Sequence, residues 1–308
     1  MTDQDTIVVL GSLNMDLVVR ARRAPAGGET AAGQAFHTIP GGKGANQALA
    51  VSRLGGKAAL VGRIGDDSFG EQLCLNLASN AVDIQSVRKE MGETTGVALI
   101  VVEENGENRI IVVPGANGKV NREDVDGAEH LIRSAGLLVM QFEIDPGVVQ
   151  YAADLAYRVG VPVLLNPSPP FAVAGNLLQK VTYLVLNEHE AEQISGLKVF
   201  DAQSAQAAAR ALQKRGVGTV ILTLGGQGVV AAAEKAWHVP AFPVEVIDST
   251  AAGDAFIGGL GVSLMRSENL PEALRFASAA GALTVTRLGA QTSIPTRQDV
   301  LDFLGPIR

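Results

Sequence analysis

The sequence is poor in cysteine, in aromatic side chains and in positive charge. Its 308 residues include one cysteine, Cys74, so no intrachain disulfide forms and a reducing, cytoplasmic location is expected. The net charge of −7 argues against a nucleic-acid partner, because neutralising a phosphate backbone requires a basic surplus. The acidic residues 1–5 are followed by no long apolar run, so neither a secretory signal nor a membrane partner is predicted.

Several catalytic patterns are absent as well. The Gly-x-Ser-x-Gly turn of serine hydrolases does not occur. The glycine cluster at 41–44 contains a lysine but lacks the Gly-Lys-Ser/Thr ending of a P-loop. No metal-ligand spacing links the histidines, which are His37, His130, His189 and His238.

Apolar runs separated by glycine and proline predict an α/β fold. Repeated strand–helix–strand units after residue 121 imply a mostly parallel sheet that helices cover on both faces. Strands are expected at 6–10, 58–61, 137–141, 161–165, 183–186 and 220–223, with a final pair at 229–233 and 239–247. Helices are expected from the glycine cluster to 54, at 69–80 and 271–286, from 146, 190 and 202, and around 177.

A second, smaller sheet is expected beside the main one. Extended segments lie between 17 and 39, and the runs 97–102 and 109–113 flank a polar turn typical of a hairpin. We interpret them as a lid, inserted at about 13–40 and 94–114 into one domain spanning 1–308. An isolated sheet of this kind exposes an apolar face and open edges, which predicts a homodimer joined lid to lid.

Polar side chains follow several of the predicted strands. Asn14 and Asp16 come just after the first strand, where ligands of open α/β sheets bind. Later strands end at Glu143, at Asn166, at Asn187 with Glu190, and at Thr223. Each of these later residues alone is best explained as a cap or turn residue, and for Asn14 and Asp16 the turn alternative stays open. Their gathering at one rim predicts a pocket.

The stretch from Asp248 to Phe256 leads from a loop of small residues into a helix without charge at 256–265. Such a helix should be buried, and the backbone N–H groups around Ala252 and Gly253 at its start should attract a phosphate. Asp254 is placed to accept a proton from an attacking hydroxyl, although an aspartate here is also a common helix cap. Lys43 and Asn46, within one turn at another helix start, suit the hydroxyls of a small polyol; a solvated lysine is the alternative.

These motifs together resemble the ribokinase-like (PfkB) carbohydrate kinase family over nearly the whole chain. The motifs are Gly11–Asp16, Gly41–Ala48, Asn187–Glu190, Thr223–Gly225 and Asp248–Asp254. The Gly-Lys-Gly-Ala-Asn run is closer to the family's ribose-phosphorylating members than to its fructose or adenosine kinases. The resemblance implies ATP-dependent phosphorylation of D-ribose at the 5-hydroxyl, giving ribose 5-phosphate.

The resemblance also implies a role for each matching residue. Asp254 would be the general base, and the backbone of Ala251, Ala252 and Gly253 would form an anion hole for the γ-phosphate. The residues implied to hold the sugar are Asn14, Asp16, Gly42, Lys43, Asn46, Glu143 and Asp254. Those implied to bind ATP are Asn187, Thr223, Gly225, Gly228, Gly253 and Ser278.

Two metal sites are implied in the same way. Glu190 would help to place Mg²⁺ through water. A monovalent cation such as K⁺ would lie among Asp248, Thr250, Thr284, Arg287, Gly289 and Ser293. The alternative for Asp248 is an ion pair with Arg287 or a turn cap.

Other functions stay open at this point. A kinase of the same fold for another pentose or a nucleoside is the first alternative. A sugar-binding regulator without catalysis is the second, and the presence of Asp254, the anion-hole segment and Glu190 argues against it.

Overall fold

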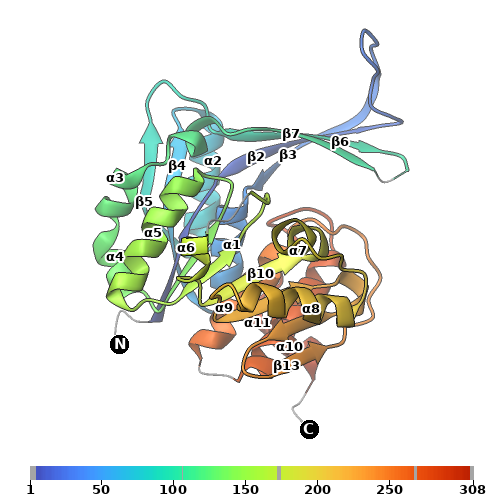
Figure 1. The fold of residues 1–308 in the computed structure, drawn as a ribbon. Coiled ribbons are helices and arrows are strands. Elements are labelled where there is room, and N and C mark those ends of the chain that lie inside the picture. The colour runs from blue at the N-terminus through green and yellow to red at the C-terminus, as the bar shows by residue number, and fades with distance from the viewer. Residues whose placement is uncertain (1–4, 106, 172–174, 267–268, 306–308) are drawn as a thin grey trace.

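The computed structural model describes residues 5–105, 107–171, 175–266 and 269–305. A nine-stranded sheet runs through the main body, and a four-stranded sheet projects from one end of it (Figure 1). Among the helices that these residues form, none is long and apolar enough to cross a bilayer.

The main sheet is parallel except at one edge. In spatial order its strands are β13 (Ala236–Val239), β12 (Val229–Ala232), β11 (Thr219–Thr223), β10 (Tyr183–Asn187), β9 (Val163–Asn166), β8 (Leu137–Gln141), β1 (Thr6–Leu10), β4 (Lys57–Gly65) and β5 (Val82–Glu90). Only the β11–β12 and β12–β13 pairings are antiparallel. The carboxyl ends of β8 to β11 therefore meet at one rim.

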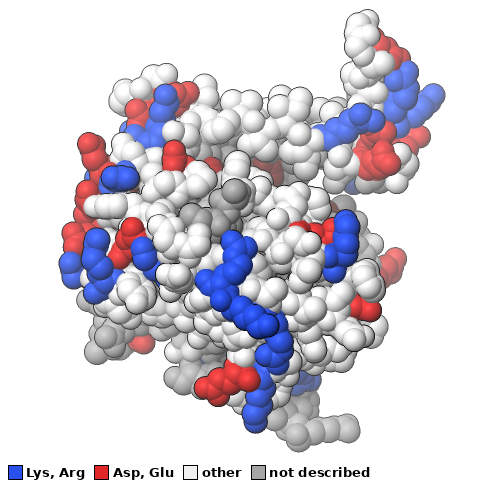
Figure 2. All heavy atoms as spheres, viewed as in Figure 1, with Lys and Arg blue, Asp and Glu red and all other residues white. Residues whose placement is uncertain are grey.

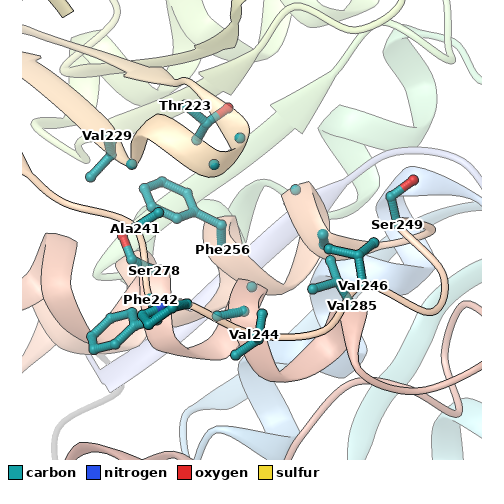
Figure 3. A pocket seen from close by; sticks show the side chains of 18 residues that line it. Thr223, Val229, Ala241, Phe242, Val244, Val246, Ser249, Phe256, Ser278 and Val285 are labelled. Atoms are coloured by element: carbon teal, nitrogen blue, oxygen red, sulfur yellow. The ribbon is translucent and has the colours of Figure 1, made fainter.

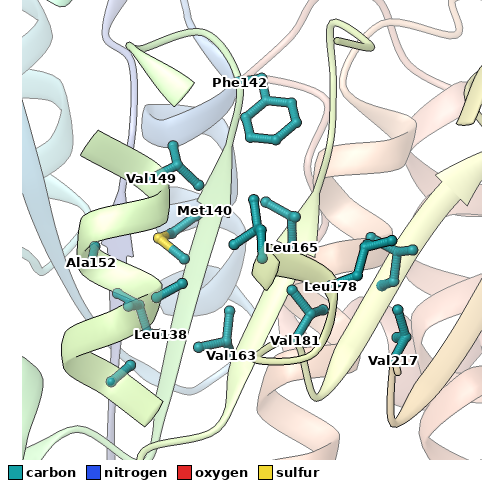
Figure 4. Packing of buried hydrophobic residues seen from close by; sticks show 14 of the residues in the cluster. Leu138, Met140, Phe142, Val149, Ala152, Val163, Leu165, Leu178, Val181 and Val217 are labelled. Carbon is teal, nitrogen blue, oxygen red and sulfur yellow. The ribbon is translucent and has the colours of Figure 1, made fainter. Parts of the chain in front are cut away.

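Helices cover both faces of this sheet, and each face has its own apolar core. On one face lie α3 (Arg122–Gly127), α4 (Glu129–Ser134), α5 (Pro146–Val159), α6 (Gly175–Leu178), α7 (Glu188–Ser195) and α8 (Ala202–Gln213). On the other lie α1 (Lys43–Arg53), α2 (Ser68–Ser79), α9 (Ala252–Met265), α10 (Leu270–Val285) and α11 (Arg297–Leu304). Figure 4 shows the first core, where Val149 and Ala152 of α5 pack on Leu138 of β8. Strands buried on both sides explain the continuous apolar runs in the sequence.

The small sheet, called the lid below, has the order β3 (Gly33–Gly41), β2 (Asn14–Ala21), β6 (Gly96–Glu103) and β7 (Asn108–Val113). Strand β2 starts four residues after β1 ends, and the 3-10 turn η2 (Gly115–Lys119) returns the chain from β7 to the body. The projecting tip of the lid carries charges of both signs, whereas the stretch between tip and body shows few charged atoms in this view (Figure 2).

The expected architecture is confirmed, with a mostly parallel sheet between two helical layers and a separate small sheet. Several elements went unpredicted, namely β5, α3, α4 and α11. Strand β5 lies at the sheet edge, and its sequence VDIQSVRKE is too polar to read as a buried strand. The division into one domain with two lid insertions stays a prediction, and Gly106 in the lid hairpin lies outside the described residues.

One predicted strand is wrong. Residues 239–247 were expected to pair in the sheet, but β13 ends at Val239 and the following residues run without strand structure to 247. Pro240 and Pro243 interrupt the segment, and proline cannot donate a hydrogen bond to a neighbouring strand. The segment lines a cavity instead.

Candidate active site

The site forms where α9 crosses α1. A side chain at Gly258 of α9 would place its Cβ 2.5 Å from the Cβ of Ala50 of α1, so glycine allows the two helices to touch. Asp254 lies one turn before Gly258, and Asn46 lies one turn before Ala50. The crossing therefore brings the starts of the two helices together, and with them the side chains of Asn46 and Asp254.

Asp254 is buried at this crossing and both of its carboxylate oxygens accept hydrogen bonds. Asn46 Nδ2 donates to Oδ2 at 3.0 Å, and Gln47 Nε2 donates to Oδ1 at 2.9 Å. The helix-cap alternative is wrong, because α9 begins after Ala251 and no side chain caps it. Burial raises the pKa of Asp254, and this rise is opposed by the charge of Lys43 and by the two amide donors.

Asn14 and Asp16 lie on β2, where the lid leaves the body. Asn14 pairs with Gly41 across the β2–β3 ladder, so the turn-residue alternative is wrong for both. A Cβ at Gly41 would lie 2.4 Å from Asp16 Oδ2, which shows how closely the glycine turn approaches this carboxylate. Gly42 has φ 87°, a conformation that glycine adopts without strain.

Glu143 ties three segments together at the end of β8. Its Oε2 accepts from Ser12 Oγ at 2.5 Å, from the Lys43 N–H at 3.0 Å and from Asn14 Nδ2 at 3.4 Å. The Lys43 ammonium faces several carboxylates. Burial lowers its pKa, but the charges of Asp254, Glu143 and Glu190 outweigh burial and raise it. Because Lys43 also lines a cavity, the solvated-lysine alternative does not describe it.

Two adjoining cavities open beside Asp254. The first, of about 230 Å³, is polar, and its lining includes Lys43, Asn166, Ser168, Asn187, Glu190 and Asp254. The second, of about 500 Å³, is mostly apolar and lies between the β11–β12 turn, residues 241–246 and helices α9 and α10 (Figure 3). Thr223, Ser249 and Gly253 line both. The junction of the two cavities therefore lies at the start of α9.

Helix α9 is buried from Asp254 to Ser263, as predicted, and its start faces the two cavities. Gly253 is exposed, and Ala251 has the left-handed φ of 61°, rare for a residue with a side chain. The Ala252 N–H donates a long hydrogen bond, of 3.3 Å, to the Ser249 carbonyl before the helix. First-turn N–H groups have no acceptor within their own helix, so the end of α9 presents donors to an anion at the junction.

The predicted nucleotide residues fall on these two cavities. Thr223, Gly225, Gly228, Gly253 and Ser278 line the apolar cavity, and Asn187 lines the polar one. A Cβ at Gly228 would lie 2.1 Å from the Val239 carbonyl, so the turn closes only around glycine. The apolar wall that Phe242, Val244 and Val246 supply was not predicted, because that segment was expected to be a strand.

Glu190 is a buried carboxylate in the polar cavity. It accepts from the Asn187 N–H at 3.0 Å and from Asn166 Nδ2 at 3.5 Å, while Asn187 caps α7. Within the described part of the chain, no group of three Asp, Glu, His or Cys side chains is arranged to hold a metal. A single carboxylate beside a phosphate site nevertheless suits Mg²⁺, which keeps water and phosphate oxygens as its main ligands.

Asp248 joins the loop before α9 to the loop after α10. Its Oδ1 accepts from the Thr250 N–H and hydroxyl at 2.9 and 2.6 Å, and its Oδ2 accepts from the Gly289 N–H at 3.0 Å. Arg287 pairs with Asp299 instead, so the predicted alternative of an Asp248–Arg287 pair is wrong. Thr284 and Ser293 are buried, and their hydroxyls bond the Ala280 and Ala290 carbonyls.

Four polar residues of the site were not assigned a role from sequence, namely Ser12, Gln47, Asn117 and Gln141. Asn117 of η2 accepts from the Leu13 N–H at 2.9 Å and donates to Asn14 Oδ1 at 2.7 Å. Gln47 lies inside the glycine-rich motif Gly41–Ala48, so its place in the sequence could have indicated a role in the site. Asn117 and Gln141 lie in no motif that was recognised, and only the fold brings them to the site.

The profile for pfkB family carbohydrate kinases matches residues 4–297. The chain belongs to this family. It is accordingly an ATP-dependent carbohydrate kinase.

Two relatives and one solved structure illustrate the similarity. A ribokinase from Haemophilus influenzae is 41% identical over 300 residues, which cover 97% of this chain and 98% of that protein. A deoxyribokinase from Salmonella typhi is 34% identical over 300 residues, with coverage of 97% and 98%. The structure of Arabidopsis thaliana ribokinase complexed with ribose and ATP has a TM-score of 0.91 and 32% identity, and covers 97% of this chain and 98% of that one.

The wild-type protein should lose free energy of unfolding as the pH rises toward 7, and replacing Asp16 by asparagine should remove this loss. Burial first, then the charges of Glu143 and Asp254, raise the pKa of Asp16 from 3.8 to about 7. Between these values the folded protein holds a proton that the unfolded chain releases, so the free energy of unfolding falls as the pH rises toward 7. Urea unfolding of the free protein at about pH 5 and about pH 8 should show a loss of about 2 kcal/mol that Asp16→Asn lacks.

Asp302→Asn, at an exposed position of α11, is the matched control and should behave as the wild type. Equal pH dependence in the wild type and Asp16→Asn would show that Asp16 is ionised in the folded protein throughout this range.

Proposed function

We propose that this kinase transfers the γ-phosphoryl group of ATP to the 5-hydroxyl of D-ribose. The observation that carries the proposal is the buried Asp254 carboxylate at the start of α9, where a polar cavity meets an apolar one. A carboxylate that can take a hydroxyl proton and a helix start that can hold a phosphate lie side by side there. The likeness to proteins named ribokinase supports the choice of sugar.

The sugar would lie between the lid junction and α1. Asp16, Glu143 and Asp254 offer acceptors, and Lys43 and Asn14 offer donors, to the several hydroxyls of a small sugar. Gly42 leaves room at the turn. Among the described residues, Asn46 Oδ1 is a buried oxygen without a hydrogen-bond partner, which a sugar hydroxyl would satisfy.

The transfer step needs few groups. The 5-hydroxyl oxygen attacks the γ-phosphorus while its proton passes to Asp254, and the bond from the γ-phosphorus to the bridging oxygen breaks to release ADP. The charge on the γ-phosphoryl oxygens would be met by the backbone N–H groups of Ala251, Ala252 and Gly253. Because phosphoryl transfer depends mainly on positioning and charge stabilisation, no covalent enzyme intermediate is required.

The nucleotide would occupy both cavities. Its base would lie in the apolar cavity near Ser278, between the Gly225–Gly228 turn and Phe242, and its phosphates would extend past Thr223 toward Asn187. Glu190, with Asn166 and Asn187 beside it, would hold Mg²⁺ through water, and the ion would supply positive charge to the phosphates. The Asp248–Gly289 junction offers oxygen ligands to K⁺, which would brace the loop before α9.

Two further assignments belong to this proposal. A deoxyribose substrate is the second candidate, favoured by the deoxyribokinase among the relatives. A cytoplasmic location fits a reaction that consumes ATP. A non-catalytic regulator is disfavoured because it would not need the buried carboxylate at the phosphate site.

We further propose that two copies join through the lid. All of Ile110, Ile111, Val112 and Val113 in β7 are exposed, although successive residues of a strand point to opposite faces. Strand β7 is also an edge of the four-stranded sheet. An apolar edge strand left open promotes aggregation, and pairing of two lids is the simplest closed cover.

The replacement Asp254→Asn tests the reaction. Asparagine keeps the size of the side chain but cannot take the proton, so kcat should fall by a factor of about 10² or more. A coupled ADP-release assay with ribose, 2-deoxyribose, fructose and adenosine should give ribose the highest kcat/KM, since a site built to bond hydroxyls rejects sugars lacking them. Near-normal turnover in the variant would remove Asp254 from the mechanism. A preference of about tenfold for the nucleoside or the hexose would refute ribose as substrate.

Exchange of the monovalent cation tests the Asp248 site. At constant ionic strength, initial rates in K⁺ should exceed those in Na⁺ or tetramethylammonium, because a bound ion fixes the loop that leads into the anion hole. A misplacement of about 1 Å can cost roughly 10²-fold in rate. Asp248→Ala should abolish the difference between the salts. Equal wild-type rates in all three salts would mean that no functional cation site exists.

The molar mass of the protein in solution tests whether two copies join through the lid. Light scattering at micromolar concentration should give twice the 32.0 kDa of the chain, and Ile111→Asp should shift the protein to the single-chain mass. Tyr157→Asp, which places the same charge at an exposed position of α5, is the control and should leave the mass unchanged. A wild-type mass of 32.0 kDa would contradict the dimer.

A further inference from the structure

The base is held by a chain of buried amides that reaches back into the sheet. Gln47 Nε2 of α1 donates to Asp254 Oδ1, and Gln141 Nε2 at the end of β8 donates to Gln47 Oε1 at 2.6 Å. Both glutamines are fully buried and neither lines the two cavities. They therefore act on the reaction only through Asp254.

We propose that Gln47 and Gln141 form a positioning relay that orients Asp254 and keeps its carboxylate in the proton-accepting form. The inference rests on the proposed role of Asp254 as the base. No other function is assumed for the two glutamines.

The hydrogen bonds of the relay have only one workable direction. An ionised carboxylate only accepts, so Gln47 must present its Nε2 to Asp254 and its Oε1 to the next residue. Gln141 donates a hydrogen bond from its Nε2 to this oxygen. If Gln47 turned its amide around, its Oε1 would face Asp254 and its Nε2 would face the Nε2 of Gln141. Gln141 therefore fixes the orientation of Gln47, and Gln47 fixes the orientation of the base.

At Gln141, the end of the relay away from Asp254, this direction of donation leaves one buried oxygen without a hydrogen bond from the described part of the chain. Gln141 Oε1 is buried without a hydrogen-bond partner among the described residues. It lies against Gly11, where a Cβ would come within 2.0 Å of it. A buried unpaired oxygen is unfavourable, and turning the Gln141 amide would remove the donor that Gln47 requires. The arrangement thus favours donation toward Asp254 over satisfaction of Gln141.

Donation to the charged form matters because the surroundings of Asp254 are mixed. Burial and the charges of Glu143 and Asp16 disfavour the ionised form of Asp254, whereas the charge of Lys43 favours it. Glu190 adds a further carboxylate to the same cavity. Amide donors stabilise the ionised form at any pH, since they do not titrate. Each carboxylate oxygen keeps a further lone pair, so the base can still receive the hydroxyl proton.

The test compares three variants. Gln47→Met removes the donor to the base, Gln141→Met leaves Gln47 free to turn, and Gln141→Glu keeps the shape but replaces the donor by an acceptor. Gln213→Met is the control, because this glutamine of α8 also bonds two carbonyls, those of Gly218 and Ala233, and lines neither cavity. Each variant is assayed with ribose and ATP across pH, and its thermal unfolding is recorded.

In Gln47→Met the acid limb of the kcat/KM profile should move up by about one pH unit, with kcat about tenfold lower near neutrality and partly restored at high pH. Gln141→Met should move the acid limb in the same direction but by less than Gln47→Met does. The shift in Gln141→Glu should be larger than the shift in Gln141→Met. The KM for ATP should not change. The control should keep the wild-type profile.

Other outcomes would overturn the relay. A loss of kcat that follows only the folded fraction, with the pH profile unmoved, would show that the glutamines are merely structural. If Asp254→Asn abolishes activity while all three glutamine variants behave as the wild type, the base stands and the relay is refuted. If Asp254→Asn itself is active, the proposed function fails, and the relay with it.

Discussion

The close crossing of α1 and α9 is the constraint on which the rest of the site depends. Gly258 lets α9 touch α1, and Gly44 lets the start of α1 touch the end of β1, where a Cβ would come within 2.6 Å of the Gly11 carbonyl carbon. The two glycine contacts hold the start of α1 between the sheet and α9. Because Asp254 and the N–H groups of the proposed anion hole share the first turn of α9, one packing arrangement positions both the proposed base and the proposed phosphate site.

This arrangement concentrates charge where water is scarce. Asp16, Glu143 and Asp254 surround Lys43, and burial raises the pKa of Asp254 while Asp16 reaches about 7. Three carboxylates near one ammonium are unfavourable in the free protein, and a sugar with several hydroxyls would relieve the strain by bonding them. Such sites exchange stability for function. Hydrogen bonds from Ser12, Asn46 and Gln47, together with the Lys43 N–H, limit the cost by giving the carboxylates donors that do not titrate.

The sequence predicted what depends on local pattern and left out what depends on long-range contact. Buried parallel strands are continuous apolar runs, so the architecture was predictable, whereas the polar edge strand β5 and the short helices α3 and α4 carry weak patterns. Asp254 and Asn46 lie at helix starts that glycines precede, which made them visible in the sequence. Gln141 ends an ordinary buried strand, and only the parallel pairing of β8 with β1 shows that its amide reaches α1. The segment at 240–247 was misjudged because apolar residues that line a cavity resemble those that fill a sheet.

The lid and the proposed sugar site are joined by hydrogen bonds and move together. The chain first enters the lid through β2, which carries Asn14 and Asp16, and leaves it for the last time through η2, which carries Asn117. Figure 1 shows β2 running from the body into the lid. Asn117 bonds both the backbone and the side chain around Asn14, and a Cβ at Gly96 of β6 would come within 2.2 Å of both asparagine side chains. The amide of Asn14 thereby has its oxygen committed to Asn117 and its nitrogen turned toward Glu143. A displacement of either end of the lid must move Asn14 or Asn117, so the position of the lid and the contacts of the proposed sugar site cannot vary independently.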